Sequence, residues 1–160
     1  MMSKLNLLEN LIENKSIRVH LEAKDWKDAI KLACLPLEQS GVINEKYYNE
    51  ILNQTAKYGP YYVIAPQLAM PHASATEDCV FGNGFSLITL RHPVVFENDQ
   101  EVSVLIGLAA KDGETHTQIA IPQIIAVFED PDNVTKIQEF KTEQEIIDFI
   151  KSVDYTKYLP

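Results

Sequence analysis

Two of the four histidines stand where a reactive side chain is expected. His72 follows Met70 and Pro71 at the end of the mainly apolar run 63–70, and Ala73 leaves open space beside its ring. Pro71 fixes its own φ and biases Met70 toward an extended conformation, so the backbone that reaches His72 is stiff while the ring can point outward. Such a histidine could accept a phosphoryl group, act as a general base or bind a metal, since imidazole is nearly neutral at cell pH. It could equally be a loop histidine without chemistry.

His116 follows the almost wholly apolar segment 102–110 and the turn 111–113, in the first turn of a helix expected over 115–128. An apolar segment of this kind is typical of a strand covered on both faces, which predicts a central position in a sheet. Ligand sites of α/β sheets lie where the strands end, and the free N–H groups of a helix start favour anions. We therefore predict that His72 and His116 meet at one sheet edge. One can then act as nucleophile while the other donates a hydrogen bond to the developing charge.

The other two histidines and the two cysteines are weaker candidates for a catalytic or metal-binding role. His20 and His92 favour structural or solvated roles, and Cys34 and Cys79 have neither a C-x-x-C nor a Cys/His metal spacing, which indicates reduced thiols. A zinc site would need a third ligand that this spacing does not supply, so we expect no metal and no cofactor. The lack of a G-x-S-x-G motif disfavours a Ser/His/Asp hydrolase. A metal-dependent hydrolase built on the two candidate histidines stays open as an alternative.

Composition describes an acidic globular chain of 160 residues with a formal net charge of −9. This length suits a single domain over 1–160, large enough to bury about two-thirds of its unfolded surface. The charge argues against nucleic acid and anionic membranes as partners, because both attract Lys and Arg, and favours a basic protein partner. Residues 1–6 lack a long apolar core and no apolar run approaches membrane-spanning length, so we expect a cytoplasmic protein that does not insert into a membrane.

The sequence predicts both helices and strands. Helical spacing and N-cap residues predict helices that start near residue 7, after Asp25 and Asn44, at 115, and at Asp132 and Thr142. Pro36 predicts a kink or an early end of the helix that otherwise reaches Ser40-Gly41. Strands are expected at 17–20, 61–65, 85–90, 94–96 and 102–110. In this interpretation 61–65 enters the His72 turn, the polar loop 75–78 follows, and 85–90 and 94–96 are two adjacent strands. Together they predict an α/β fold, a three-layer α/β/α sandwich with a mixed β-sheet flanked by helices.

Three groups of residues carry a resemblance to a known family. They are the Pro-His motif 68–73, the strand pair 85–90 and 93–96, and the apolar segment 104–110 followed by Thr115-His116. On these motifs, over nearly the whole chain, the protein resembles the enzyme IIA (EIIA) type-2 components of the bacterial phosphoenolpyruvate-dependent phosphotransferase system, in the mannitol/fructose type family. Within it, the chain is most similar to the ascorbate-specific IIA proteins. That similarity rests on residues 13–18, 59–66, 128–130 and 142–145.

The resemblance implies a phosphotransferase that works as a phosphocarrier for sugar transport, in this case ascorbate uptake. It implies that Nε2 of His72 receives a phosphoryl group from the phosphocarrier HPr and passes it to a cysteine of enzyme IIB, which acts with the IIC permease. It implies that His116 lies beside His72 and stabilises the phosphoryl group, and that the sugar acid is phosphorylated at the IIB/IIC stage. An alternative within the same fold is a regulatory domain that senses phosphorylation and is not dedicated to transport.

One departure from the family pattern concerns the phosphate contacts. Mannitol-type members carry an arginine upstream of the Pro-His motif, whereas this chain has no arginine between Arg18 and Arg91. Lys57 is the cation nearest to the expected place. A lysine ammonium is a point charge and does not replace a guanidinium fork, so the role of the arginine is not carried over to it.

Overall fold

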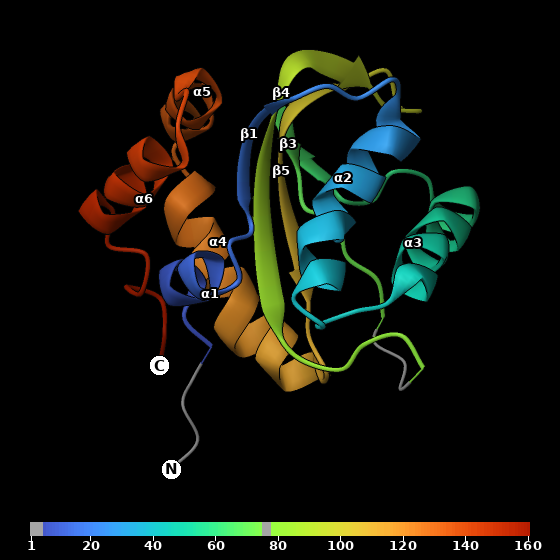
Figure 1. The fold of residues 1–160 in the computed structure, drawn as a ribbon, viewed down its shortest axis with the longest axis horizontal. Coiled ribbons are helices and arrows are strands. Elements are labelled where there is room, and N and C mark those ends of the chain that lie inside the picture. The colour runs from blue at the N-terminus through green and yellow to red at the C-terminus, as the bar shows by residue number, and fades with distance from the viewer. Residues whose placement is uncertain (1–4, 75–77) are drawn as a thin grey trace.

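The computed structural model of the protein describes residues 5–74 and 78–160, so most of the expected polar loop 75–78 lies outside the described residues. Within them, one mixed sheet has the strand order β1-β4-β5-β3-β2 (Figure 1). The strands are β1 (Ile17–Leu21), β2 (Val63–Ala65), β3 (Gln67–Ala69), β4 (Gly84–Val95) and β5 (Glu101–Ala109). β5 pairs antiparallel with β4 and parallel with β3, so it occupies the central position that its apolar sequence predicts.

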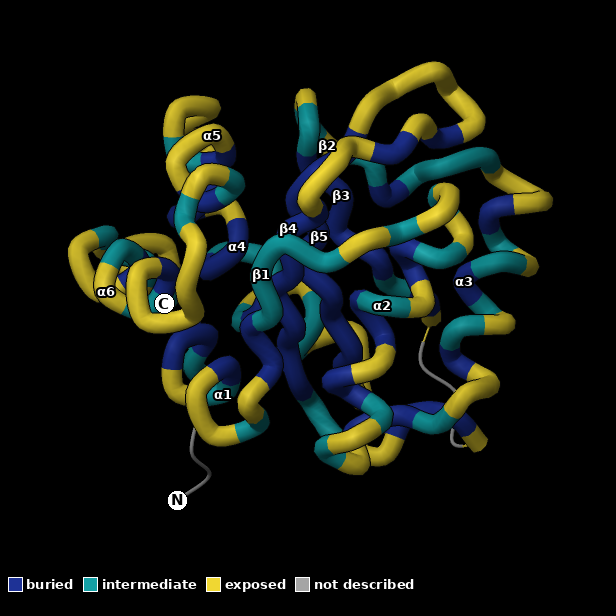
Figure 2. The backbone as a smooth tube through the Cα atoms, turned by 45° about the horizontal axis from the view of Figure 1, so that its top comes forward, coloured by how far each residue is buried: buried dark blue, intermediate teal, exposed yellow. Residues whose placement is uncertain are grey.

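Helices cover both faces of the sheet, as the sequence predicts for a three-layer α/β/α sandwich (Figure 1). One face carries α2 (Trp26–Gln39) and α3 (Glu45–Tyr58), and the other carries α1 (Leu7–Glu13), α4 (Ile121–Phe128), α5 (Pro131–Glu139) and α6 (Glu143–Ser152). Successive side chains of a strand point to opposite faces. On β5, Leu105 packs on the side of α2 and α3, and Val104 packs on the other side. Most of the two central strands, β4 and β5, is therefore buried, while the outer turns of the helices are exposed (Figure 2).

Local capping explains where several helices start. The side chains of Asp25, Asn44 and Thr142 accept backbone N–H groups of the first turns of α2, α3 and α6, as predicted. α5 begins one residue earlier than the predicted start at Asp132: Asp130 caps the helix and Pro131 is its first residue, a position that suits a residue without an N–H.

The sequence predicts either a kink or an early helix end at Pro36, and of these two alternatives the early end is wrong. α2 continues to Gln39, because Ser40 N donates to Pro36 O at 3.0 Å and keeps the helical bonding beyond the proline.

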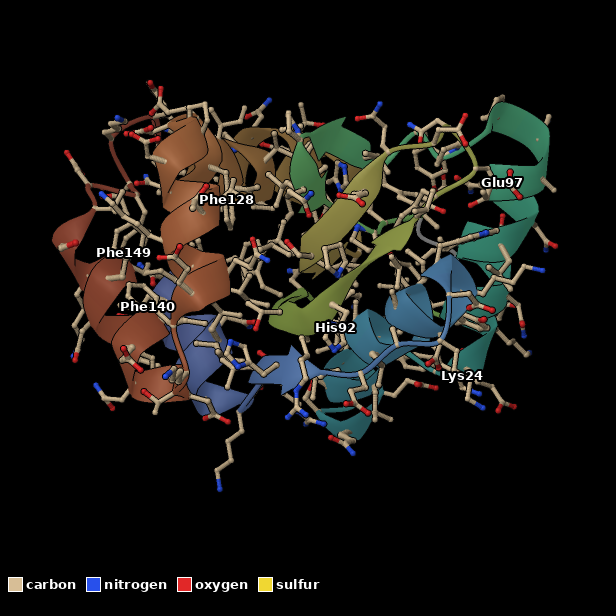
Figure 3. All side chains as sticks on the ribbon, turned by 90° about the horizontal axis from the view of Figure 1, so that it is seen from above. Lys24, His92, Glu97, Phe128, Phe140 and Phe149 are labelled. Carbon is tan, nitrogen blue, oxygen red and sulfur yellow. The ribbon has the colours of Figure 1, made fainter. Side chains whose placement is uncertain are left out.

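α5 and α6 are connected by an aromatic contact. The rings of Phe140, which follows α5, and Phe149 of α6 pack with their centroids 5.7 Å apart (Figure 3).

The expected strands differ from the structure at two places. Segments 85–90 and 94–95 belong to one strand, β4, because the pairing with β5 is irregular between Thr89 and Val94 and so needs no N–H from Pro93. Phe96 follows the end of this strand. Segment 61–65 contributes only β2, and the chain then reverses at Gln67, where φ is 66°, into β3. The strand that enters the Pro-His turn is therefore β3.

The helix expected over 115–128 is two elements. It begins as a π-helix, η1 (Thr115–Ala120), and continues as α4. Pro122 has no N–H for the carbonyl of Gln118, and its ring crowds that carbonyl, so a widened turn before the proline relieves both problems. His116 lies in the π-helical part.

Candidate active site

Parallel pairing of β3 and β5 brings the two candidate histidines together. Both strands end at the same sheet edge, where Pro71 and His72 follow β3 and the segment leading to His116 follows β5. The ring centroids of His72 and His116 lie 5.2 Å apart, with the ring planes at 44°. The two side chains therefore share one site, as the sequence predicts.

The tautomer of His72 follows from one contact. Its Nδ1 lies 2.7 Å from the carbonyl oxygen of Met70. A carbonyl oxygen can only accept a hydrogen bond, so Nδ1 carries the proton in the neutral ring. Nε2 is then left with a free lone pair, which is the form that a nucleophilic imidazole needs.

Hydrogen bonds fix the backbone around His72. Leu108 N donates to Pro71 O at 3.1 Å, which ties the turn to the end of β5. On the other side of His72, Ala73 N donates to the Tyr47 hydroxyl at 3.0 Å, and the same hydroxyl lies 2.6 Å from Leu108 O. The turn that carries the histidine is thus held to the central strand from both of its flanks.

Burial affects the charge state of both histidines. It lowers the pKa of His72, and the hydrogen bond to Met70 O opposes this in part. Burial also lowers the pKa of His116, and the positive charge that His72 would carry lowers it further. Both rings are therefore neutral near pH 7, which favours nucleophilic attack by one and hydrogen bonding by the other.

The two rings open into a cleft of about 510 Å³. Tyr61 forms part of its wall, and Lys111 and Asp112 supply charged groups. The Asp112 carboxylate is engaged, because it accepts from Thr115 N at 2.7 Å and from Thr115 Oγ1 at 3.1 Å at the start of the helix. These bonds lower the pKa of Asp112. Among the described residues that line the cleft, Lys111 is the only lysine or arginine.

The structure separates the other candidates from the cleft. Lys57 lines a neighbouring hollow, with its Nζ 5.1 Å from the centroid of the Tyr58 ring. His92 is exposed on β4 (Figure 3). A ring nitrogen of His20 lies 3.3 Å from the carbonyl oxygen of Gln138 in α5. Lys111 could have been found from the sequence as the first charged residue after the central strand.

Two further observations concern the described part of the chain. Residues 5–74 and 78–160 contain no group of three or more His, Cys, Asp or Glu side chains arranged to hold a metal ion. Over the same residues, every helix is too short or too polar to cross a membrane.

The chain is similar to known proteins in both sequence and fold. Residues 10–153 match the family described as phosphoenolpyruvate-dependent sugar phosphotransferase system, EIIA 2. The ascorbate-specific PTS system EIIA component of Escherichia coli (strain K12) is 43% identical over 148 residues, which are 91% of this chain and 96% of that protein.

Solved structures agree with this match. The crystal structure of the candidate PTS IIA protein PtxA from Streptococcus mutans has a TM-score of 0.90 and 44% identity, and covers 97% of this chain and 99% of that one. The enzyme IIA of the mannitol system of Escherichia coli, solved in complex with phosphorylated enzyme IIB, shares the fold with a TM-score of 0.75 at 20% identity, over 86% of this chain and 95% of that one.

Proposed function

The chain belongs to the EIIA 2 family of the phosphoenolpyruvate-dependent sugar phosphotransferase system, and from this premise we propose that it is a cytoplasmic phosphocarrier whose acceptor is His72. The observation that carries the proposal is the free lone pair on Nε2 of His72, set by the bond from Nδ1 to Met70 O, inside a cleft shared with His116.

The proposed transfer balances at these atoms. Nε2 of His72 forms a bond to phosphorus while the bond from phosphorus to a histidine nitrogen of HPr breaks, and the electron pair of that bond returns to the HPr imidazole. Nδ1 of His72 keeps its proton, which the Met70 carbonyl holds as the ring becomes positive. Such transfers need positioning and charge stabilisation more than covalent chemistry by the protein.

His116 and Lys111 are the groups that we assign to charge stabilisation. The His116 ring lies beside the acceptor, and Lys111 is one of the residues that line the same cleft. A neutral His116 can donate one N–H to a phosphoryl oxygen, and an ammonium adds a positive charge. Neither role requires the arginine that the sequence lacks.

The donor and the recipient are proposed from the family. We propose that HPr loads His72 and that a cysteine of an ascorbate-type IIB protein takes the group, in a system completed by a IIC permease. Two findings on relatives support this: the 43% identical Escherichia coli protein is an ascorbate-specific EIIA component, and a IIA protein of the same fold was solved with phosphorylated IIB. The net charge of −9 suits transient docking to a basic partner surface.

The test is intact mass after incubation with phosphoenolpyruvate, enzyme I and HPr. Wild type should gain one acid-labile phosphoryl group, His72→Ala should gain none, and His116→Ala should gain it more slowly. His92→Ala is the matched control, because His92 is exposed on β4 outside the cleft, and should behave as wild type. An unmodified wild type, with phosphorylated HPr verified, would sink the proposal.

A second step separates transport from regulation. Phosphorylated protein is mixed with an ascorbate-type IIB protein, and the phosphoryl group is followed to the IIB cysteine. Transfer supports the carrier function. Loading on His72 without transfer to IIB favours the regulatory alternative instead.

A further inference from the structure

We propose that Tyr61 is a positioning residue for His72 that holds both the backbone and the imidazole of the acceptor, an inference that rests on the function proposed above. The Tyr61 hydroxyl donates a hydrogen bond to the carbonyl oxygen of His72. Its ring meets the imidazole edge to face, with ring centroids 5.2 Å apart and planes at 89°. One side chain thus contacts the acceptor at its main chain and at its ring.

Tyr61 can do this because it is itself fixed. Its backbone N donates to Gly59 O at 2.8 Å, and its ring packs edge-on against Tyr62 at a centroid distance of 4.9 Å. Tyr62 is fully buried, and its carbonyl accepts from Met70 N at 2.7 Å. The segment before β2 and the turn after β3 therefore form one unit, joined by backbone and side-chain bonds.

The protonation state of Tyr61 suits a permanent donor. Burial, with smaller contributions from Tyr62 and Glu50, raises the pKa of its phenol well above the ordinary value of 10.0. The hydroxyl keeps its proton at every pH at which the protein works, so the bond to the His72 carbonyl does not titrate.

The imidazole of His72 is bounded on several sides. Tyr61 and His116 each lie at a centroid distance of 5.2 Å, and Nδ1 is held by Met70 O. Removing the Tyr61 ring leaves space on one side, into which the imidazole can turn away from the Met70 carbonyl. A displacement of about 1 Å at a reacting atom can reduce a rate by about 100-fold.

Two substitutions separate the contacts. Tyr61→Phe removes the hydrogen bond and keeps the ring, whereas Tyr61→Leu removes both. Tyr48→Leu is the matched control, because Tyr48 packs against the same apolar cluster as Tyr61 but is not part of the cleft wall.

The assays are the rate of phosphorylation by phosphorylated HPr and the tautomer of His72 by nitrogen-15 NMR. We expect Tyr61→Phe to be about fivefold slower, the equivalent of one hydrogen bond, and Tyr61→Leu roughly 10- to 100-fold slower. Only Tyr61→Leu should lose the preference for the Nδ1–H tautomer. Tyr48→Leu should stay within about twofold of wild type, although its buried ring area is lost as well.

The results of these assays decide whether Tyr61 positions His72. If Tyr61→Leu phosphorylates as fast as Tyr48→Leu and keeps the wild-type tautomer, the positioning role is overturned. If Tyr61→Leu does not fold, Tyr61→Phe decides by its rate. If wild type accepts no phosphoryl group, the proposed function fails, and the tautomer measurement still tests Tyr61 independently.

Discussion

Replacing Tyr47 by phenylalanine should destabilise the protein by about 2–4 kcal/mol. The Tyr47 side chain is 1% exposed, and its hydroxyl accepts from Ala73 N at 3.0 Å and donates to Leu108 O at 2.6 Å. Phenylalanine keeps the ring but leaves a buried donor and a buried acceptor unpaired, each of which costs about 1–3 kcal/mol. The lower part of the summed range applies because Ala73 is 8% exposed and can recover a water contact.

The position of Leu108 at the end of the sheet explains why no other donor can replace the Tyr47 hydroxyl at the Leu108 carbonyl. β3 ends at Ala69, whereas β5 continues to Ala109. The N–H and the C=O of Leu108 both point past the end of β3, because the two groups of one strand residue face the same neighbour. Pro71 O accepts the N–H, and the Tyr47 hydroxyl serves the C=O. Phenylalanine at position 47 removes this substitute for a neighbouring strand.

Urea unfolding followed by circular dichroism measures this change. Tyr48→Phe is the control on the same helix, since Tyr48 is only partly buried, and should change the free energy of unfolding by less than about 0.5 kcal/mol. A loss below about 1 kcal/mol for Tyr47→Phe, at an unchanged m-value, would refute the claim that both backbone groups depend on this hydroxyl.

Three further predictions concern pH, packing and charge. Burial lowers the pKa of His72 in the folded protein below its ordinary value of 6.5. The stability that its neutral ring contributes is therefore present above the unfolded-state pKa and is lost as the pH falls through the folded-state pKa. Between about pH 7.5 and about pH 5, the free energy of unfolding should fall less in His72→Gln than in wild type. Gly107→Ala places a Cβ 2.3 Å from Ser86 Oγ and should cost about 1–3 kcal/mol in urea unfolding, and combining it with Ser86→Ala should restore part of the loss. Lys111→Gln should slow phosphorylation by HPr up to about fivefold, since an exposed ion pair contributes up to about 1 kcal/mol. Lys57→Gln should not slow it, and an equal effect of both would contradict the assignment of Lys111.

The sequence predicts what depends on periodicity and on strand ends. The uninterrupted apolar run places β5 at the centre of the sheet, because only a strand covered on both faces tolerates such a run. A histidine that follows a neighbouring parallel strand must then emerge at the same edge as His116. The meeting of His72 and His116 was predictable because it needs topology and no side-chain detail.

Errors arose where a local signal had two structural solutions. Pro93 ends a central strand in most contexts, but here it lies at an irregular part of the β4–β5 pairing, where no N–H is required. Pro122 leaves a helical carbonyl without its usual donor, and within the helix expected over 115–128 the preceding turn widens to the π-helix η1 before α4 continues. The sequence shows the missing donor and not the way in which the neighbouring strand or turn accommodates it.

The tyrosines that hold the site were missed for another reason. Helical spacing identifies Tyr47 as a core residue, and its ring is one, but the partner of its hydroxyl is a backbone carbonyl 61 residues away. Tyr61 donates to a backbone carbonyl 11 residues away. Every residue has a carbonyl, so such an acceptor leaves no mark in the sequence, whereas an imidazole does. Residue types therefore reveal the groups that react, and only the folded backbone reveals which side chains hold them in place.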